Sequence, residues 1–210
     1  MFYIEHDKMS ESLRFGDVIR NIPVCYPIIN HPISEGTYNI HIDSSDLLVV
    51  LSPCCSISDK ILLLAPLIHL NAAIYKNQYL ADNVLRINDL VQAKDSLPPI
   101  AWDNMVEAEK IERLSKSPAY VFLDIFIYMA HSTFDEYTIK GKDINVNSRY
   151  YAIDFRTAFR IHCDKIGNPK FSLGESKLLQ LSLETRNLLR RKIASFYTRI
   201  PEEDIAFMAP

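Results

Sequence analysis

The sequence predicts an α+β fold, and two observations carry that prediction. Two short, continuously apolar runs at residues 47–51 and 61–67 have the length of strands and flank a polar link rich in turn-forming residues. Alanine, Asn, Gln, Lys and Glu then replace the β-branched runs at about residues 70–117, which favours helices there. Because neither apolar run alternates, we expect a buried antiparallel hairpin that lies inside a barrel or under helices.

Further strands are expected on both sides of this hairpin. Gly16 and Asp17 form a turn signal that opens a first strand, and residues 37–42 alternate between apolar and polar side chains. Residues 141–148 are expected to form a loop. The expected strands fall at about residues 16–67 and 120–163, with the later ones at 120–127, 150–155 and 158–162.

Helices are expected in two places. The insertion at about residues 70–117 should hold two of them, the second capped by Asp103. A long C-terminal helix is expected at about residues 173–200, because Ser172 and Glu175 have capping-box spacing and the leucines that follow form a broad apolar face. Three basic residues of this helix suit the negative end of its dipole, or could contact the phosphates of a nucleic acid or an acidic partner. They are Arg186, Arg190 and Arg191.

Composition places the chain among ordinary globular proteins and limits its partners. The 210 residues are 48% hydrophobic and 23% charged, and we expect a single domain over residues 1–210. The formal net charge of -3 argues against a protein that coats nucleic acid or an anionic membrane over its whole surface. A local basic face stays compatible with that charge.

Cysteine usage and the first residues of the chain point to the cytoplasm. The four cysteines lack CxxC spacing, and the charged start of the chain is unlike a signal peptide. The longest apolar stretch, residues 119–130, contains Asp124 and is shorter than the roughly 20 residues of a membrane span. We therefore expect a cytoplasmic protein with reduced thiols and no membrane segment.

Three patches in a fixed order resemble the PemK/MazF group of toxin endoribonucleases. They are a GDV turn at residues 16–18, a VVLSP strand at 49–53 whose partner strand ends near Pro66, and AIDFR at 152–156 before a C-terminal helix. The resemblance implies a small SH3-like β-barrel, here with a helical insertion and a long C-terminal helix. The LSPCCSI segment is also similar to an uncharacterised bacterial family with an LS-x-x-C-D-I motif.

The same resemblance argues against ribonuclease activity. The family cleaves RNA with an Arg just before the VVLSP strand and a Ser or Thr at the end of the partner strand, and these positions fall on Asp46 and Ile68. A carboxylate repels a phosphate, and isoleucine can neither donate nor accept a proton. We therefore assign no catalytic residue, cofactor or metal ligand. A relocated endoribonuclease site would have to use His69, Arg156 and Arg20, together with Arg14.

Other candidate residues have structural explanations that weigh more. Cys54 and Cys55 could bind a metal with His69, but adjacent cysteines are poor chelators, and packing is the default. Asp154 and Arg156 lie two apart on a strand, and a structural ion pair is favoured over a site.

The function expected from these observations is interaction rather than catalysis. We expect a non-catalytic, toxin-like barrel that binds a protein partner in a bacterial toxin–antitoxin or phage-defence type system, with a homodimer as one form of that interaction. The alternatives are an endoribonuclease with a relocated site and a cysteine-based metal-binding regulator.

Overall fold

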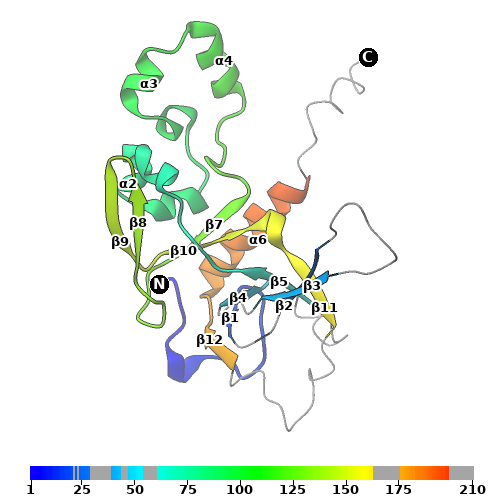
Figure 1. The fold of residues 1–210 in the computed structure, drawn as a ribbon. Coiled ribbons are helices and arrows are strands. Elements are labelled where there is room, and N and C mark those ends of the chain that lie inside the picture. The colour runs from blue at the N-terminus through cyan, green and yellow to red at the C-terminus, as the bar shows by residue number, and fades with distance from the viewer. Residues whose placement is uncertain are drawn as a thin grey trace. The chain divides into compact units, whose positions relative to one another are not determined.

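The computed structural model describes residues 1–20, 22, 24–28, 39–43, 47–53, 61–162 and 176–198 (Figure 1). The chain divides into two compact units. Unit 1 comprises residues 1, 3–67 and 157–182, and unit 2 comprises residues 2, 68–156 and 183–210. The expected single domain stays a prediction.

Unit 1 is built on a five-stranded antiparallel sheet with the order β11-β5-β4-β1-β12. A separate hairpin pairs β2 with β3. The elements are η1 (His6–Lys8), β1 (Val18–Ile19), β2 (Val24–Ile28), β3 (Asn39–Asp43), β4 (Leu48–Val50), β5 (Ile61–Pro66), β11 (Phe159–His162) and β12 (Lys177–Leu179).

The expected central hairpin is confirmed as the antiparallel pair β4–β5, in which Val49 lies opposite Ala65. All three residues of β4 are buried, as a continuously apolar strand requires. The core of unit 1 gathers around this pair and includes Leu13, Ile19, Leu48, Val50, Leu62 and Leu64.

The GDV turn is held by backbone contacts with β4. Gly16 has a φ of 86°, a conformation that favours glycine, and its N–H donates to the carbonyl of Val50 at 2.7 Å. Asp17 is fully buried, and its Oδ2 lies 2.7 Å from Nζ of the equally buried Lys177 in β12. The Lys177 ammonium also donates to the Ser10 carbonyl at 2.8 Å. The GD pair is therefore a structural feature that joins β1, β4 and β12.

The serine of the LSP patch is also structural. Ser52 is buried, and its hydroxyl accepts a hydrogen bond from the Leu63 N–H at 2.7 Å. At this end of the β4–β5 pair, the serine hydroxyl takes the place of a backbone carbonyl as the acceptor for the Leu63 N–H.

Unit 2 holds a three-stranded antiparallel sheet, β6-β10-β7, and a hairpin of β8 and β9. Its strands are β6 (Ile68–His69), β7 (Ile125–Tyr128), β8 (Tyr137–Gly141), β9 (Ile144–Ser148) and β10 (Tyr151–Asp154). Its helical elements are η2 (Ala72–Lys76), α2 (Gln78–Ala81), η3 (Val84–Asn88), η4 (Ala93–Ser96), α3 (Pro99–Asp103), α4 (Glu107–Ser115) and α6 (Leu183–Thr198), and η5 (Phe155–Thr157) follows β10.

Asn88 ties the helical segment to the sheet of unit 2. Its buried side chain donates to the Ile127 carbonyl at 2.8 Å and accepts from the Ile127 N–H at 2.7 Å. The asparagine thereby satisfies both backbone groups of Ile127 in strand β7.

The structure confirms the α+β class, with four α-helices and several antiparallel sheets among the described residues. These strands form separate sheets and no closed barrel. Strands expected in one barrel are instead divided, because β7 and β10 pair within unit 2 while β11 pairs with β5 in unit 1.

Three local expectations were wrong. The loop expected at residues 141–148 contains β9, and residues 177–179 form β12 rather than a helix. Asp103 ends α3 instead of capping α4, which begins at Glu107 without a side-chain cap. The capping-box pair Ser172 and Glu175 lies outside the described residues.

Asparagines explain why the first part of the insertion forms short turns rather than one helix. Asn71, Asn77 and Asn83 each accept a hydrogen bond from the N–H two residues later, at 2.9 to 3.1 Å. Each cap starts a new turn, so η2, α2 and η3 follow one another at intervals of six residues.

Within the described ranges, no helix has the length and apolar character needed to cross a membrane.

Candidate functional site

The resemblance assigns catalysis to two positions. The one that the structure describes, Ile68, carries no catalytic group. Ile68 lies in β6 and is partly exposed. Asp46 lies outside the described residues.

His69 is an exposed ring held by other rings. It stacks on Tyr137 with 3.8 Å between centroids and a 7° interplanar angle, and it meets Tyr151 edge-on at 5.3 Å. The Tyr137 hydroxyl accepts from the Leu70 N–H at 2.9 Å and donates to the Tyr150 carbonyl. His69 is therefore part of a fixed aromatic platform, an arrangement suited to packing.

Arg156 forms the ion pair expected from its spacing to Asp154. One guanidinium nitrogen lies 2.6 Å from Oδ2 of Asp154 and 3.2 Å from Oδ2 of Asp124. Hydrogen bonds from Arg156 hold the pKa of Asp154 below its usual value, and Asp154 in turn raises the pKa of Arg156. Two carboxylates thus neutralise the arginine that a relocated nuclease would need.

The relocated site is not assembled within unit 2. His69 is paired with Tyr151 at the start of β10, whereas Asp154, the partner of Arg156, lies at its end, about 10 Å further along the strand. Arg20 is exposed and belongs to unit 1.

The cysteine hypothesis falls on residues that the structure leaves undescribed, namely Cys54 and Cys55. Among the described residues, no group of three or more His, Cys, Asp or Glu side chains is placed to hold a metal ion.

The three arginines of α6 do not share one exposed face. Arg190 and Arg191 are exposed, but Arg186 is buried together with Leu189 and Lys192. Leu183, expected on the apolar face, is largely exposed. The buried stripe of α6 is therefore partly polar.

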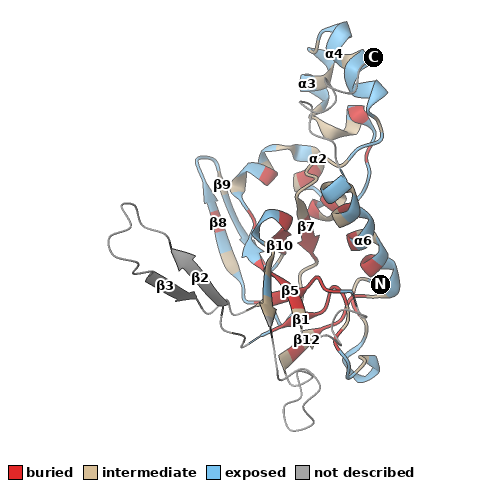
Figure 2. Cartoon of the chain, turned by 90° about the vertical axis from the view of Figure 1, so that its right-hand side faces the viewer, coloured by how far each residue is buried: buried red, intermediate tan, exposed pale blue. Residues whose placement is uncertain are grey.

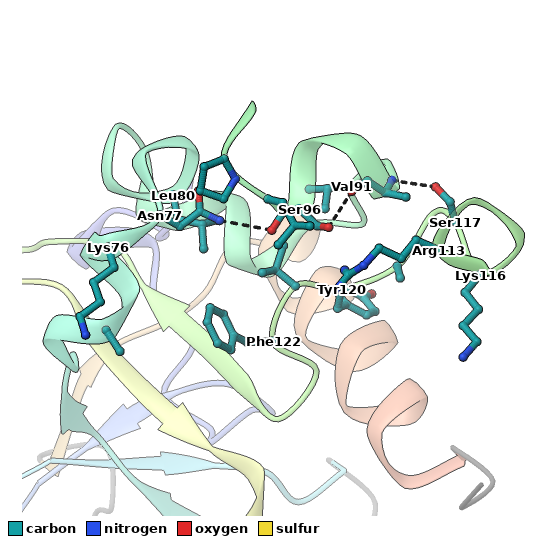
Figure 3. Close-up of a pocket in the computed structure, with 16 residues that line it drawn as sticks. Lys76, Asn77, Leu80, Val91, Ser96, Arg113, Lys116, Ser117, Tyr120 and Phe122 are labelled. Atoms are coloured by element: carbon teal, nitrogen blue, oxygen red, sulfur yellow. Dashed lines mark hydrogen bonds between the residues drawn. The ribbon is translucent and has the colours of Figure 1, made fainter. Parts of the chain in front are cut away.

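A pocket of about 600 Å³ lies in the helical insertion of unit 2 (Figure 3). Two backbone hydrogen bonds of 3.0 Å join Val91 to Ala119 and close the base of the segment that carries η4, α3 and α4. The walls are largely apolar and include Leu80, Val91, Leu97, Tyr120 and Phe122. The volume lies in the range of small-molecule sites.

The charged residues that line this pocket are all cationic. Lys76, Arg113 and Lys116 line it, and no acidic residue does. Lys116 is paired with Glu112 at 2.9 Å. Among the described residues, Lys76 and Arg113 form no ion pair, so two positive charges stay available.

Lys192 of α6 lies behind one pocket wall. Its Nζ sits over the Tyr120 ring, 5.0 Å from the centroid, and donates to the Ile87 carbonyl. The side chain is fully buried, and desolvation lowers its pKa from 10.5 to about 7, although Asp124 and Asp89 oppose that change. Burial also raises the pKa of Asp89.

Helix α4 exposes its apolar side chains. None of its residues is buried, and Ile111 and Leu114 are 60% and 52% exposed. Ile100 of α3 and Val106, which precedes α4, are exposed as well. Figure 2 shows α4 largely in the pale blue of exposed residues. Ile111 lies about 200° around the helix from Arg113, so the apolar face and the pocket use different sides of α4. Ile111 and Leu114 lie three residues apart and share one face of α4. We refer to the four exposed residues Ile100, Val106, Ile111 and Leu114 as the apolar patch.

Comparisons with protein-family models, curated proteins and solved structures found no match to this chain.

Sequence reasoning found neither the pocket nor the buried lysine. Lys76 and Arg113 are far apart in the chain, and no motif links them. The one signal in the sequence was the spacing of Lys110, Arg113 and Lys116, which places three cations along one side of a helix.

Proposed function

We propose that this chain is a non-catalytic, toxin-like module that binds a protein partner in a bacterial toxin–antitoxin or phage-defence type system. The observation that carries the proposal is the apolar patch on α3 and α4. An amphipathic helix normally buries its apolar stripe, and α4 buries none of its residues. Exposed apolar groups that lie together, as Ile111 and Leu114 do on one face of α4, mark interaction surfaces.

We call the module toxin-like because sequence patches in unit 1 resemble the PemK/MazF group, whose members are small SH3-like barrels. The GDV and VVLSP patches lie in the neighbouring strands β1 and β4, with Val18 opposite Val49, which supports this relation. The lost catalytic positions and the neutralised Arg156 support a binding role over cleavage.

The partner we propose is a different protein with an extended apolar segment. A stable interface buries roughly 800 Å² on each side, and four side chains on two short helices supply only a fraction of that area. A second copy offering the same small patch would therefore form a weak pair. A partner whose contacts extend beyond the patch can reach the required area.

The test compares partner capture by matched variants. Tagged wild type, an Ile111→Glu/Leu114→Glu variant and a Leu90→Glu control are used as baits in the native host, and captured proteins are identified by mass spectrometry. Leu90 is an exposed leucine outside α3 and α4, so the control repeats the chemistry elsewhere. The captured protein is then purified and titrated against all three baits.

We expect wild type and the control to bind the same protein, and the double variant to bind at least about tenfold more weakly with an unchanged melting temperature. Equal binding by the double variant would refute the proposed surface. A wild type that binds only itself, as seen by light scattering, would replace the proposed partner with a homodimer.

A further inference from the structure

The pocket of unit 2 combines three properties that define a ligand class. It has a volume of about 600 Å³ and apolar and aromatic walls, and its lining includes cationic side chains but no carboxylate. Small-molecule sites share this pattern of an apolar lining with a few polar groups that orient the ligand.

The aromatic walls suit a flat ring. Tyr120 and Phe122 both line the pocket, close to the buried Leu80 (Figure 3). Lys192 Nζ lies over the Tyr120 ring, which helps to hold that ring in position. Aromatic side chains of this kind stack on bases at roughly 1–3 kcal/mol per base.

The cations suit an anion. Figure 3 shows the Arg113 side chain extending toward Tyr120, so a guanidinium lies beside the aromatic wall. Guanidinium groups bind phosphate oxygens in bidentate geometry, and Lys76 adds positive charge elsewhere in the lining. A cationic ligand would meet repulsion and no carboxylate.

We propose that this pocket binds a nucleoside monophosphate, with the base against Tyr120 and Phe122 and the phosphate at Arg113. Inorganic phosphate alone leaves the apolar walls uncovered, and a nucleoside alone leaves the guanidinium unpaired. Both parts of the ligand are therefore needed for affinity.

Isothermal titration of the full chain with AMP, GMP, CMP and UMP tests the proposal, with the matching nucleosides and inorganic phosphate as comparison ligands. We expect at least one nucleotide to bind, and its nucleoside and inorganic phosphate to bind about tenfold more weakly or less. No binding by any of the four nucleotides would overturn the proposal, and so would equal affinity for nucleoside and nucleotide.

Variants separate the two contacts. Arg113 is exposed, so Arg113→Ala should fold normally and weaken nucleotide binding about tenfold or more. Phe122→Leu keeps an apolar wall but removes the ring and should also weaken binding. The control Lys140→Ala removes an exposed lysine of β8 outside the pocket lining and should leave binding unchanged.

An unchanged affinity in Arg113→Ala would overturn the phosphate contact. An Ile111→Gln/Leu114→Gln variant, which adds no charge beside Arg113, should keep its nucleotide affinity because those side chains do not line the pocket. This separates a failure of the pocket proposal from a failure of the proposed partner surface.

Discussion

Replacing Lys192 with methionine should change how the stability of the protein depends on pH. Lys192 is fully buried in α6, and its pKa falls from 10.5 to about 7 on folding because burial disfavours the charged ammonium. Between these two values the unfolded chain binds more protons than the folded chain. The free energy of unfolding of the wild type therefore rises with pH across this window.

The structure sets the magnitude of this effect. The difference between the two pKa values corresponds to a destabilisation of about 5 kcal/mol, present in full below pH 7 and lost as the pH approaches 10.5. Between pH 7 and pH 9 the wild type should gain about 2 kcal/mol from this group. Methionine cannot donate to the Ile87 carbonyl, and an unsatisfied buried carbonyl costs about 1–3 kcal/mol. Lys192→Met should thus be about 2 kcal/mol more stable at pH 7 and about equal to wild type at pH 9.

Urea unfolding of wild type, Lys192→Met and Lys140→Met at several pH values between 6.5 and 9 measures these differences. Lys140 is exposed, so its variant should track the wild type at every pH. A constant difference between wild type and Lys192→Met across the range would refute the reasoning, because a fully hydrated lysine stays protonated in both states.

Three further outcomes are expected. Asp17→Asn should lower the free energy of unfolding by roughly 3–5 kcal/mol, because the Lys177 charge is then buried without its partner. Adding Lys177→Met should restore part of the lost stability. A double variant as unstable as Asp17→Asn would contradict the paired-charge explanation. Purified protein should leave single-stranded RNA intact, and cleavage that His69→Ala or Arg156→Ala abolishes would instead support the endoribonuclease alternative. Elemental analysis of protein prepared without chelators should find well below one zinc per chain, whereas stoichiometric zinc that Cys55→Ser removes would establish the cysteine-based alternative.

Local patterns predicted the elements whose partners are close in the sequence. The apolar runs at residues 47–51 and 61–67 predicted the β4–β5 pair, because a strand buried on both faces needs no polar alternation. The spacing of Asp154 and Arg156 predicted their ion pair for a similar reason, since both side chains lie within two residues.

Elements that depend on distant partners were not predictable in this way. Strand β9 is an exception, because its partner β8 directly precedes it and Gly141 lies opposite Ile144. Ile144 and Val146 alternate with Asn145 and Asn147, a strand pattern that the loop prediction missed. Residues 177–179 have leucines suited to a helix, yet Lys177 pairs with Asp17 from the start of the chain. The pocket likewise needs Lys76 and Arg113 from opposite ends of the insertion, and no local pattern connects them.

The Asn88 contact has a consequence for solubility. In the three-stranded sheet β6-β10-β7, strand β7 lies at the edge, and its sequence is Ile-Phe-Ile-Tyr. An apolar edge strand with free backbone groups is a template onto which strands of other molecules can add. The Asn88 amide occupies both the N–H and the carbonyl of Ile127, which ends the ladder with a side chain that cannot extend it. In the folded protein, one asparagine side chain thus blocks the addition of another strand at Ile127 of this apolar edge.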